Sequence, residues 1–238
     1  MKLLTTDTDY DKTIKLTNDL LINPYEYDVV FHCYWYGNLN EKHLISIKSC
    51  YLFNVVQNKS NHSRKIILWI ENNVPNEYNY KITKYATICQ FDFQNSCYQI
   101  INKSKYANIN NINTDITSSQ YMTLTYYSDA VRLALLYVHG GCWFDLDVFF
   151  LRNFDPIFSS FSDKICVYQW ESFNVPNNAI IISLQPFSKA LRLTINLMIQ
   201  RNKGFGFMIA NMKYTLPCDL FVLPCSWFDS NWLHHNKL

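Results

Sequence analysis

The sequence predicts an α/β protein, a single domain with a central, mostly parallel sheet flanked by helices. Segments with the residue preferences of strands alternate with segments of helical periodicity, which favours parallel strands joined by crossover helices. The chain has 238 residues and 49% of them are apolar, so it can bury a full core. Since no repeat or Pro/Ser-rich linker divides it, we expect one domain over residues 28–238. Residues 1–27 are expected to form an N-terminal extension packed on or flanking that domain.

The first elements of the expected sheet lie in the first 90 residues. A buried strand is predicted over Asp28–Gly37, where β-branched and aromatic residues lead to a glycine turn. A helix is predicted over Glu41–Phe53 and a second buried strand over Lys65–Ile70. A further helix is expected near Tyr80–Thr87, and the Asn- and Ser-rich segment Asn102–Ser119 is expected to be a loop.

The middle of the chain predicts a helix that ends at two glycines. Met122–His139 contains neither Pro nor Gly and carries apolar residues at helical spacing. Gly140 and Gly141 can adopt positive φ, so we expect them to end the helix. Asp129 and Arg132 are three residues apart and therefore share a face near the start of this helix.

Two carboxylates follow the glycines. Trp143–Phe150 is aromatic and β-branched, hence an expected strand, whose period of two sends Asp145 and Asp147 to the same face. Adjacent ionised carboxylates repel each other and are costly to desolvate, so a cation is expected between them. Mg²⁺ or Mn²⁺ fits, because such ions take one or two carboxylates together with phosphate oxygens and water. Arg132 is suited to pair with Asp129, with phosphate or with sugar hydroxyls.

Other interpretations of the D-x-D pattern exist. Asp7 and Asp9 match it as well, in a polar N-terminal segment where solvated side chains are expected. A phosphatase of the haloacid dehalogenase type also places D-x-D after an apolar strand. That motif requires Thr or Val two residues past the second Asp and lies near the N-terminus. Here Phe149 occupies the position and the motif lies past mid-chain, which disfavours the phosphatase.

The last third of the chain continues the alternation of strands and helices. Strands are predicted over Lys164–Gln169, Ala179–Ser183 and Leu220–Leu223. A helix is predicted over Lys189–Gln200, and Gly204–Gly206 is expected to open another short helix.

The composition indicates which kinds of partner and which cellular compartment are expected. The net charge is +2 without a concentrated basic stripe, so nucleic-acid binding is not expected. The eight cysteines form no C-x-x-C pair, and we expect free thiols in a reducing, cytoplasmic compartment. No signal peptide or transmembrane segment is expected. Abundant Asn, Ile, Lys and Tyr are typical of an AT-rich genome, such as that of a microbe or of a virus in its host cell.

The run SDAVRLALLYVHGGCWFDLDV, from Ser128 to Val148, resembles the core of the DXD-type glycosyltransferases. Their pattern is S-D followed by two apolar residues and R, and then Y-x-x-G-G before an aromatic residue and the D-x-D pair. The family includes α-1,4-galactosyltransferases, yeast mannosyltransferases and clostridial glucosylating toxins. The resemblance implies a GT-A fold, which is a Rossmann-like single domain. It also implies metal-dependent transfer of a hexose from a nucleotide diphosphate sugar with retention of configuration.

The resemblance also implies roles for particular residues. In the family's first strand, which Phe31–Gly37 resembles, Trp35 matches the residue that stacks on the uracil of a UDP-sugar, and Tyr36 follows it. Within the central motif, Asp129 and Arg132 match contacts to the donor sugar, next to Ser128 in the binding segment. Asp145 matches the residue that contacts ribose and helps to position Mn²⁺ or Mg²⁺, and Asp147 matches the direct metal ligand.

Two further matches lie towards the C-terminus. Asn178, with Asn177 as the second choice, matches an Asn that faces the donor sugar. The family often supplies another metal or diphosphate contact from its C-terminal segment. This contact is assigned to His234, and Asp229, Asn231 and His235 are its alternatives.

The acceptor that the resemblance implies is a hydroxyl of a glycan or glycoconjugate. Two rival hypotheses remain at this point. One is an effector that glycosylates a protein, and the other is a non-catalytic relative that only binds a nucleotide-sugar or carbohydrate. The sequence indicates neither the donor sugar nor an oligomeric state.

Overall fold

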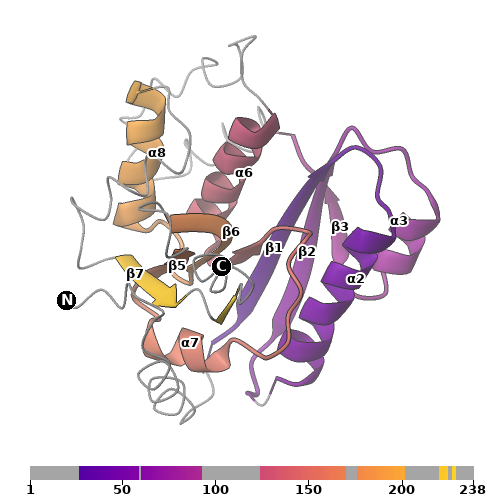
Figure 1. The fold of residues 1–238 in the computed structure, drawn as a ribbon, viewed down its shortest axis with the longest axis horizontal. Helices are drawn as coiled ribbons and strands as arrows, with labels where there is room; N and C mark the ends of the chain where they lie inside the picture. The colour runs from indigo at the N-terminus through magenta and orange to yellow at the C-terminus, as the bar shows by residue number, and fades with distance from the viewer. Residues whose placement is uncertain are drawn as a thin grey trace, which may run out of the picture.

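The computed structural model describes a seven-stranded sheet with helices on both of its faces (Figure 1). The described residues are 27–58, 60–92, 124–169, 176–201, 220–224 and 227–228. The strand order is β3-β2-β1-β4-β6-β5-β7. The strands are β1 (Val29–Tyr36), β2 (Arg64–Glu71), β3 (Thr87–Gln90), β4 (Gly141–Phe144), β5 (Ile165–Gln169), β6 (Pro176–Ser183) and β7 (Leu220–Pro224). Among these strands only β6 runs antiparallel to its neighbours, which confirms the predicted α/β class with a mostly parallel sheet.

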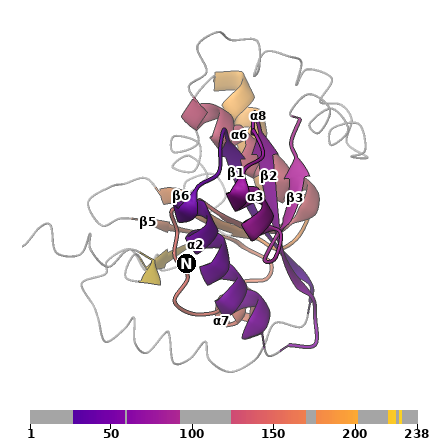
Figure 2. The same cartoon turned by 90° about the vertical axis from the view of Figure 1, so that its right-hand side faces the viewer.

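Helices cover the two faces of this sheet, as the two views in Figures 1 and 2 show. The helices are α2 (Glu41–Cys50), the π-helix η1 (Tyr51–Val56) that continues it, α3 (Glu77–Ile82), α6 (Leu124–His139), α7 (Asp155–Ser160) and α8 (Lys189–Arg201). One hydrophobic core lies between the sheet and α2, η1, α3 and α7, and a second lies between the sheet and the α6–α8 layer. None of the helices in the described ranges has both the length and the hydropathy that crossing a membrane requires.

The parallel half of the sheet follows the sequence closely. The strands predicted over Asp28–Gly37 and Lys65–Ile70 are confirmed as β1 and β2, which pair in parallel over eight residues each. Side chains of β1 alternate between the two cores. Phe31 belongs to the core on the α2 side, and Tyr34 belongs to the core on the α6 side. Both faces of β1 are therefore buried, as expected for a central parallel strand.

Two predictions before residue 92 were wrong in extent. The helix predicted over Glu41–Phe53 begins correctly, but its last turns are the π-helix η1. The helix predicted at Tyr80–Thr87 lies earlier, as α3, because Asn76 caps its N-terminus and accepts hydrogen bonds from the backbone N–H groups of the first turn. Thr87 instead begins β3, which pairs in parallel with β2.

The glycine pair joins α6 to β4 as predicted. Gly140 and Gly141 have φ of +63° and +107°, and the N–H of Gly140 donates to the Leu136 carbonyl at 2.9 Å. A Cβ on Gly140 would lie 2.4 Å from the Leu184 carbonyl oxygen, and one on Gly141 would lie 2.2 Å from that of Val30. Both positions therefore need glycine for conformation and for space.

The strands predicted over residues 164–169, 179–183 and 220–223 are confirmed as β5, β6 and β7, and the predicted helix over residues 189–200 is confirmed as α8. The short helix α7 was not predicted. The N-terminal extension over residues 1–27, apart from Tyr27, and the segments Asn102–Ser119 and Gly204–Gly206 lie outside the described residues.

Candidate active site

The candidate residues lie at the edge of the sheet where β1 and β4 have their carboxyl ends. In open α/β sheets, ligands bind at this edge. β1 and β4 are parallel neighbours with His32 opposite Trp143, so both strands run towards this edge; β4 ends beside Cys33, and β1 continues for three more residues to Tyr36. Since α6 leads into β4 through the two glycines, the first turns of α6 lie towards the same edge. The fold thus brings the helix motif and the D-x-D motif together.

Arg132 is the centre of the site. Its guanidinium lies 3.3 Å from the Asp129 carboxylate and 3.4 Å from the Asp145 carboxylate. It also donates to the Ser128 hydroxyl at 3.1 Å and to the backbone carbonyl of Asn178 at 2.6 Å. We call these five residues the Arg132 cluster. They come from α6, from the end of β4 and from β6, so one cation ties together three elements of the fold.

Asp129 and Asn178 complete the buried side of the Arg132 cluster. Asn178 donates from Nδ2 to Asp129 Oδ1 at 2.8 Å, and the side chain of neighbouring Asn177 instead accepts from the N–H of Ala179. Asp129 and Arg132 are each only 4% exposed. Between the two asparagines that the sequence offered for this position, the cluster contains Asn178. In the part of the chain that the structure describes, the side chain of Asn177 bonds only to the backbone of its own strand, two residues further along.

The sequence placed Asp145 within a strand, and this was wrong. β4 ends at Phe144, and the N–H of Val148 donates to the carbonyl of Asp145 at 3.0 Å, which closes a turn. Long-range contacts hold the chain after the turn against α2, where the Ser46 hydroxyl donates to the Val148 carbonyl at 2.7 Å. Asp145 and Asp147 therefore extend from a turn at the sheet edge rather than from one face of a strand.

The two carboxylates of the motif differ in environment. Asp145 is only partly buried, with 30% of its side chain exposed. Desolvation raises its pKa; Arg132 and the indole N–H of Trp143 act in the opposite direction, and the charge of Asp147 raises it further. Asp147 is exposed and makes no ion pair or hydrogen bond with a described residue. The oxygens of Asp147 are thus available to a ligand, whereas those of Asp145 are already engaged.

This pair fits a divalent cation that is completed by phosphate and water. No group of three or more His, Cys, Asp or Glu side chains that could hold a metal occurs among the described residues. Mg²⁺ and Mn²⁺ do not need such a group, because they commonly use one or two carboxylates and keep water or phosphate oxygens as their other ligands. Asp147 and Asp145 are therefore the described residues that could hold such an ion.

Trp143 is a site residue that the sequence reasoning missed. Its indole N–H donates to Asp145 Oδ1 at 2.8 Å, and the Arg132 guanidinium lies 5.2 Å from its ring centroid. The ring is 1% exposed. One side chain thus orients the carboxylate and packs against the cation. The sequence did contain an indication of this contact. Trp143 lies two residues before Asp145, and residues at that spacing in a strand point to the same face of the sheet.

Trp35 and Tyr36 lie at the carboxyl end of β1 but outside the Arg132 cluster. Trp35 packs on the α2 side of the sheet, where its ring centroid lies 4.0 Å from that of His43, and its indole N–H donates to the Asn38 carbonyl at 3.0 Å. Tyr36 is 42% exposed. No hydrogen bond or ion pair joins either side chain to the cluster among the described contacts. His234 lies outside the described residues.

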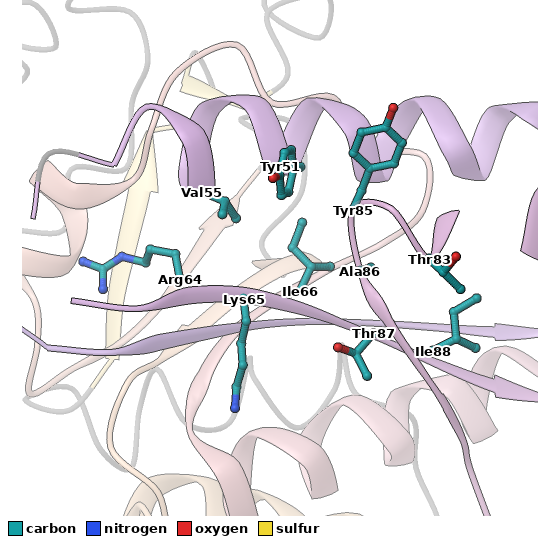
Figure 3. A pocket seen from close by; sticks show the side chains of 10 residues that line it. All are labelled: Tyr51, Val55, Arg64, Lys65, Ile66, Thr83, Tyr85, Ala86, Thr87 and Ile88. Atoms are coloured by element: carbon teal, nitrogen blue, oxygen red, sulfur yellow. The ribbon is translucent and has the colours of Figure 1, made fainter. Parts of the chain in front are cut away.

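A pocket of about 550 Å³ lies elsewhere on the molecule (Figure 3). It is lined by η1, by the residues after α3 and by the amino ends of β2 and β3, including Tyr51, Arg64 and Thr87. The amino ends of these parallel strands lie at the opposite edge of the sheet from Asp145 and Trp35. This pocket is therefore separate from the candidate site.

Comparison with known proteins agrees with the resemblance seen in the sequence. The model of the family described as "Glycosyltransferase sugar-binding region containing DXD motif" matches residues 51–162, a little under half of the chain. The matched region contains the helix motif, the glycine pair and both carboxylates, but neither Trp35 nor Asn178. The match confirms that the segment is a glycosyltransferase region and that the protein is an enzyme of the glycosyltransferase class. No curated protein matches the chain.

Solved structures share the fold. The structure described as PaToxG glycosyltransferase is 16% identical, with a TM-score of 0.51 over 95% of this chain and 82% of that chain. The apo form of mouse xyloside xylosyltransferase 1 is 12% identical, with a TM-score of 0.55 over 87% of this chain and 90% of that chain. At such identities the likeness concerns the fold alone, and it confirms the expected GT-A architecture.

Proposed function

We propose that the protein is a metal-dependent, retaining glycosyltransferase that moves a hexose from a UDP-sugar to a hydroxyl of a glycan acceptor. The observation that carries the proposal is the bridge that Arg132 forms between Asp129 and Asp145, with exposed Asp147 beside it. One guanidinium among three carboxylates leaves a net negative charge, which suits a divalent cation that brings a phosphate ligand with it.

Each residue then has a role in donor binding. Asp147 and Asp145 would hold Mn²⁺ or Mg²⁺, which when bound acts as a Lewis acid on the departing diphosphate. Asp129, Arg132 and Asn178 orient the sugar through a network whose geometry is set before the donor arrives. Ser128 supports the guanidinium. Trp35 would offer an aromatic ring for the base, and exposed Tyr36 follows it at the end of β1.

Retention of configuration is proposed through front-face attack. Within the Arg132 cluster, the carboxylates of Asp129 and Asp145 are both engaged by Arg132, which disfavours either of them as a separate nucleophile. An acceptor hydroxyl would attack the anomeric carbon from the side that the diphosphate leaves, and a diphosphate oxygen would take its proton. His234 remains a proposed additional metal ligand.

The test is donor hydrolysis across a panel of nucleotide-sugars, with Mn²⁺, with Mg²⁺ and with neither. UDP-glucose, UDP-galactose, UDP-N-acetylglucosamine, UDP-xylose and GDP-mannose separate the base from the sugar. We expect metal-dependent turnover of a UDP-sugar and an unchanged anomeric configuration by NMR. Binding of a nucleotide-sugar without turnover of any would instead establish the non-catalytic relative.

Asp147→Asn tests the metal assignment directly. Asp147 is exposed, so its substitution should leave the fold intact while metal-dependent turnover falls by at least ~100-fold. The matched control is Asp163→Asn, since Asp163 is an exposed aspartate just before the amino end of β5, at the other edge of the sheet. Equal turnover in the two variants would refute the role of Asp147. Offering glycans and proteins as acceptors to the active enzyme separates glycan assembly from the effector hypothesis.

A further inference from the structure

Two loops at the carboxyl ends of β1 and β2 are tied together by asparagine side chains. The loops comprise residues 37–40 and residues 72–76, and we call them the paired loops. Asn73 donates from Nδ2 to the Gly37 carbonyl at 2.8 Å. Asn76 donates from Nδ2 to the Leu39 carbonyl at 2.9 Å, and Asn38 Oδ1 accepts from the backbone N–H of Val74 at 3.1 Å. Gly37, Asn38 and Leu39 of the first loop each form a hydrogen bond with the second loop.

Trp35 is attached to these paired loops. Its indole N–H donates to the backbone carbonyl of Asn38 at 3.0 Å, between the two backbone carbonyls that Asn73 and Asn76 hold. From the side, the ring rests on His43, with 4.0 Å between the centroids and an interplanar angle of 49°. His43 is itself buried and fixed, because the N–H of Asn40 donates to its Nδ1 at 3.1 Å.

The asparagines of the second loop are in turn fixed to α3. Asn79 donates from Nδ2 to Asn73 Oδ1 at 2.7 Å, and the N–H of Asn76 donates to Asn79 Oδ1 at 3.0 Å. Asn76 Oδ1 caps the helix by accepting from the N–H of Tyr78 at 2.9 Å. Amide side chains suit this arrangement, since each one donates and accepts at the same time without adding charge.

We propose that Asn73, Asn76 and His43 are positioning residues that hold Trp35 in the orientation in which it stacks on the base of the donor. The proposal rests on the proposed function, in which Trp35 meets that base. A ring that is already fixed loses less conformational freedom on binding, so its stacking contributes more to affinity. The three residues lie well apart from the D-x-D motif in sequence and act through Trp35 alone.

Asn73→Ala measures the contribution of the paired loops. We expect the Kd of UDP with MnCl₂, measured by calorimetry, to rise roughly three- to tenfold, because the indole loses part of its restraint. KM for the UDP-sugar should rise with it, while kcat stays within about twofold, since the Arg132 cluster and Asp147 are unchanged. Asn58→Ala is the matched control: Asn58 makes a similar bond, from Nδ2 to the His62 carbonyl at 2.8 Å, in a loop before the amino end of β2.

Asn76→Asp provides a variant that retains the helix cap. A carboxylate still accepts from the N–H of Tyr78, but it cannot donate to the Leu39 carbonyl. The UDP Kd should again rise by a few fold, even if Asn73→Ala fails to fold. Wild-type affinity for UDP in the folded variants would overturn the proposal.

A double-mutant cycle with Trp35→Ala separates positioning from a general structural effect. If Asn73 acts through Trp35, Asn73→Ala should have no further effect on the UDP Kd once the indole is absent. An equal loss of affinity in both backgrounds would show that Asn73 does not act through Trp35. A different result, namely wild-type UDP affinity in Trp35→Ala alone, would refute the base assignment in the proposed function and the positioning role that rests on it.

Discussion

The two sides of the candidate site are held in place by different chemistry. At the centre of the Arg132 cluster, Arg132 and Asp129 are buried, and the cluster is held by ion pairs of 3.3 and 3.4 Å. The Trp35 side is held by neutral amide and carbonyl groups, and several of its residues, such as Asn38 and Asn76, are exposed. The first arrangement lies between helix and sheet, and the second joins two loops.

This difference separates stability from orientation. Removing one partner of a buried ion pair leaves an uncompensated charge, so the Arg132 cluster is bound up with the stability of the fold. Removing one exposed amide returns its partner to water at little cost, so the paired loops influence where Trp35 lies more than whether the protein folds. Substitutions on the two sides should therefore produce different kinds of loss.

The largest effect is expected from Arg132→Ala. It leaves buried Asp129 and partly buried Asp145 without their cation, and the free energy of unfolding should fall by about 3–5 kcal/mol. Arg64→Ala is the control, because Arg64 forms a comparably buried pair with Asp155 at 3.3 Å, at the amino end of β2. Urea denaturation should show similar losses for both, while calorimetry should show loss of UDP-sugar binding for Arg132→Ala alone. Equal UDP-sugar affinity in the two variants would contradict the distinction.

The next effect concerns His32, which ties β1 to the glycine turn before β4 and to Trp69 of β2. His32 lies on β1, donates from Nε2 to the Gly140 carbonyl at 3.1 Å and accepts at Nδ1 from the indole N–H of Trp69 at 3.2 Å. Burial, together with the neighbouring His139, lowers the pKa of His32 to about 3. The unfolded chain, with a pKa near the usual 6.5, therefore takes up a proton before the folded chain does.

The contribution of His32 to stability should thus be complete above about pH 6.5 and should be lost as the pH falls towards 3. Between pH 7 and pH 5 this group alone should cost roughly 2 kcal/mol. His32→Gln can still donate to the Gly140 carbonyl but has no proton to gain, so its stability should change less over this interval. Urea midpoints at the two pH values measure the difference. An identical loss in the variant and the wild type would contradict the role of His32.

The sequence predicted the charged side well because the residues that form it lie close together in the chain. Asp129 and Arg132 share a face of any helix that contains both, and the two glycines allow the turn that delivers β4. The turn after β4 could not be predicted in the same way. Residues 143–150 have strand preferences, but the hydrogen bond from Ser46, about a hundred residues away, holds the chain outside the sheet.

The neutral side was visible only in part. Trp35 followed from the family resemblance, whereas the asparagines that hold it resemble the many others in this Asn-rich chain. A local signal did exist: Asn76 and Asn79 have the spacing of a capping box, which would have moved the predicted helix from residue 80 to residue 77. The bonds from Asn73 and Asn76 to the first loop span 36 and 37 residues, and no local pattern encodes them.

A smaller effect is expected from Trp143→Phe, which removes one donor from the charged side. The phenyl ring still fills the space beneath Arg132, but Asp145 loses the indole N–H at 2.8 Å, and about 1.5–3 kcal/mol of stability should be lost. Trp69→Phe is the control, because it removes an indole N–H that donates to a neutral acceptor, His32, at 3.2 Å. It should cost about 1 kcal/mol of stability. Donor turnover should fall only in Trp143→Phe. The same turnover in both would place Trp143 in the core rather than in the site.

The smallest expected effect is the salt dependence of ligand binding, which tests the difference between the charged and the neutral side without a mutation. If the two sides recognise different parts of the donor, the charged side should respond to salt and the neutral side should not. With MnCl₂ present, the Kd of UDP should weaken severalfold between about 50 and 500 mM NaCl, because ions screen the attraction between the diphosphate and this side of the site. The Kd of uridine, which carries no phosphate, should change by less than about twofold. Similar salt dependence for the two ligands would mean that the base also meets the charged side, and that the two halves of the site are not chemically separate.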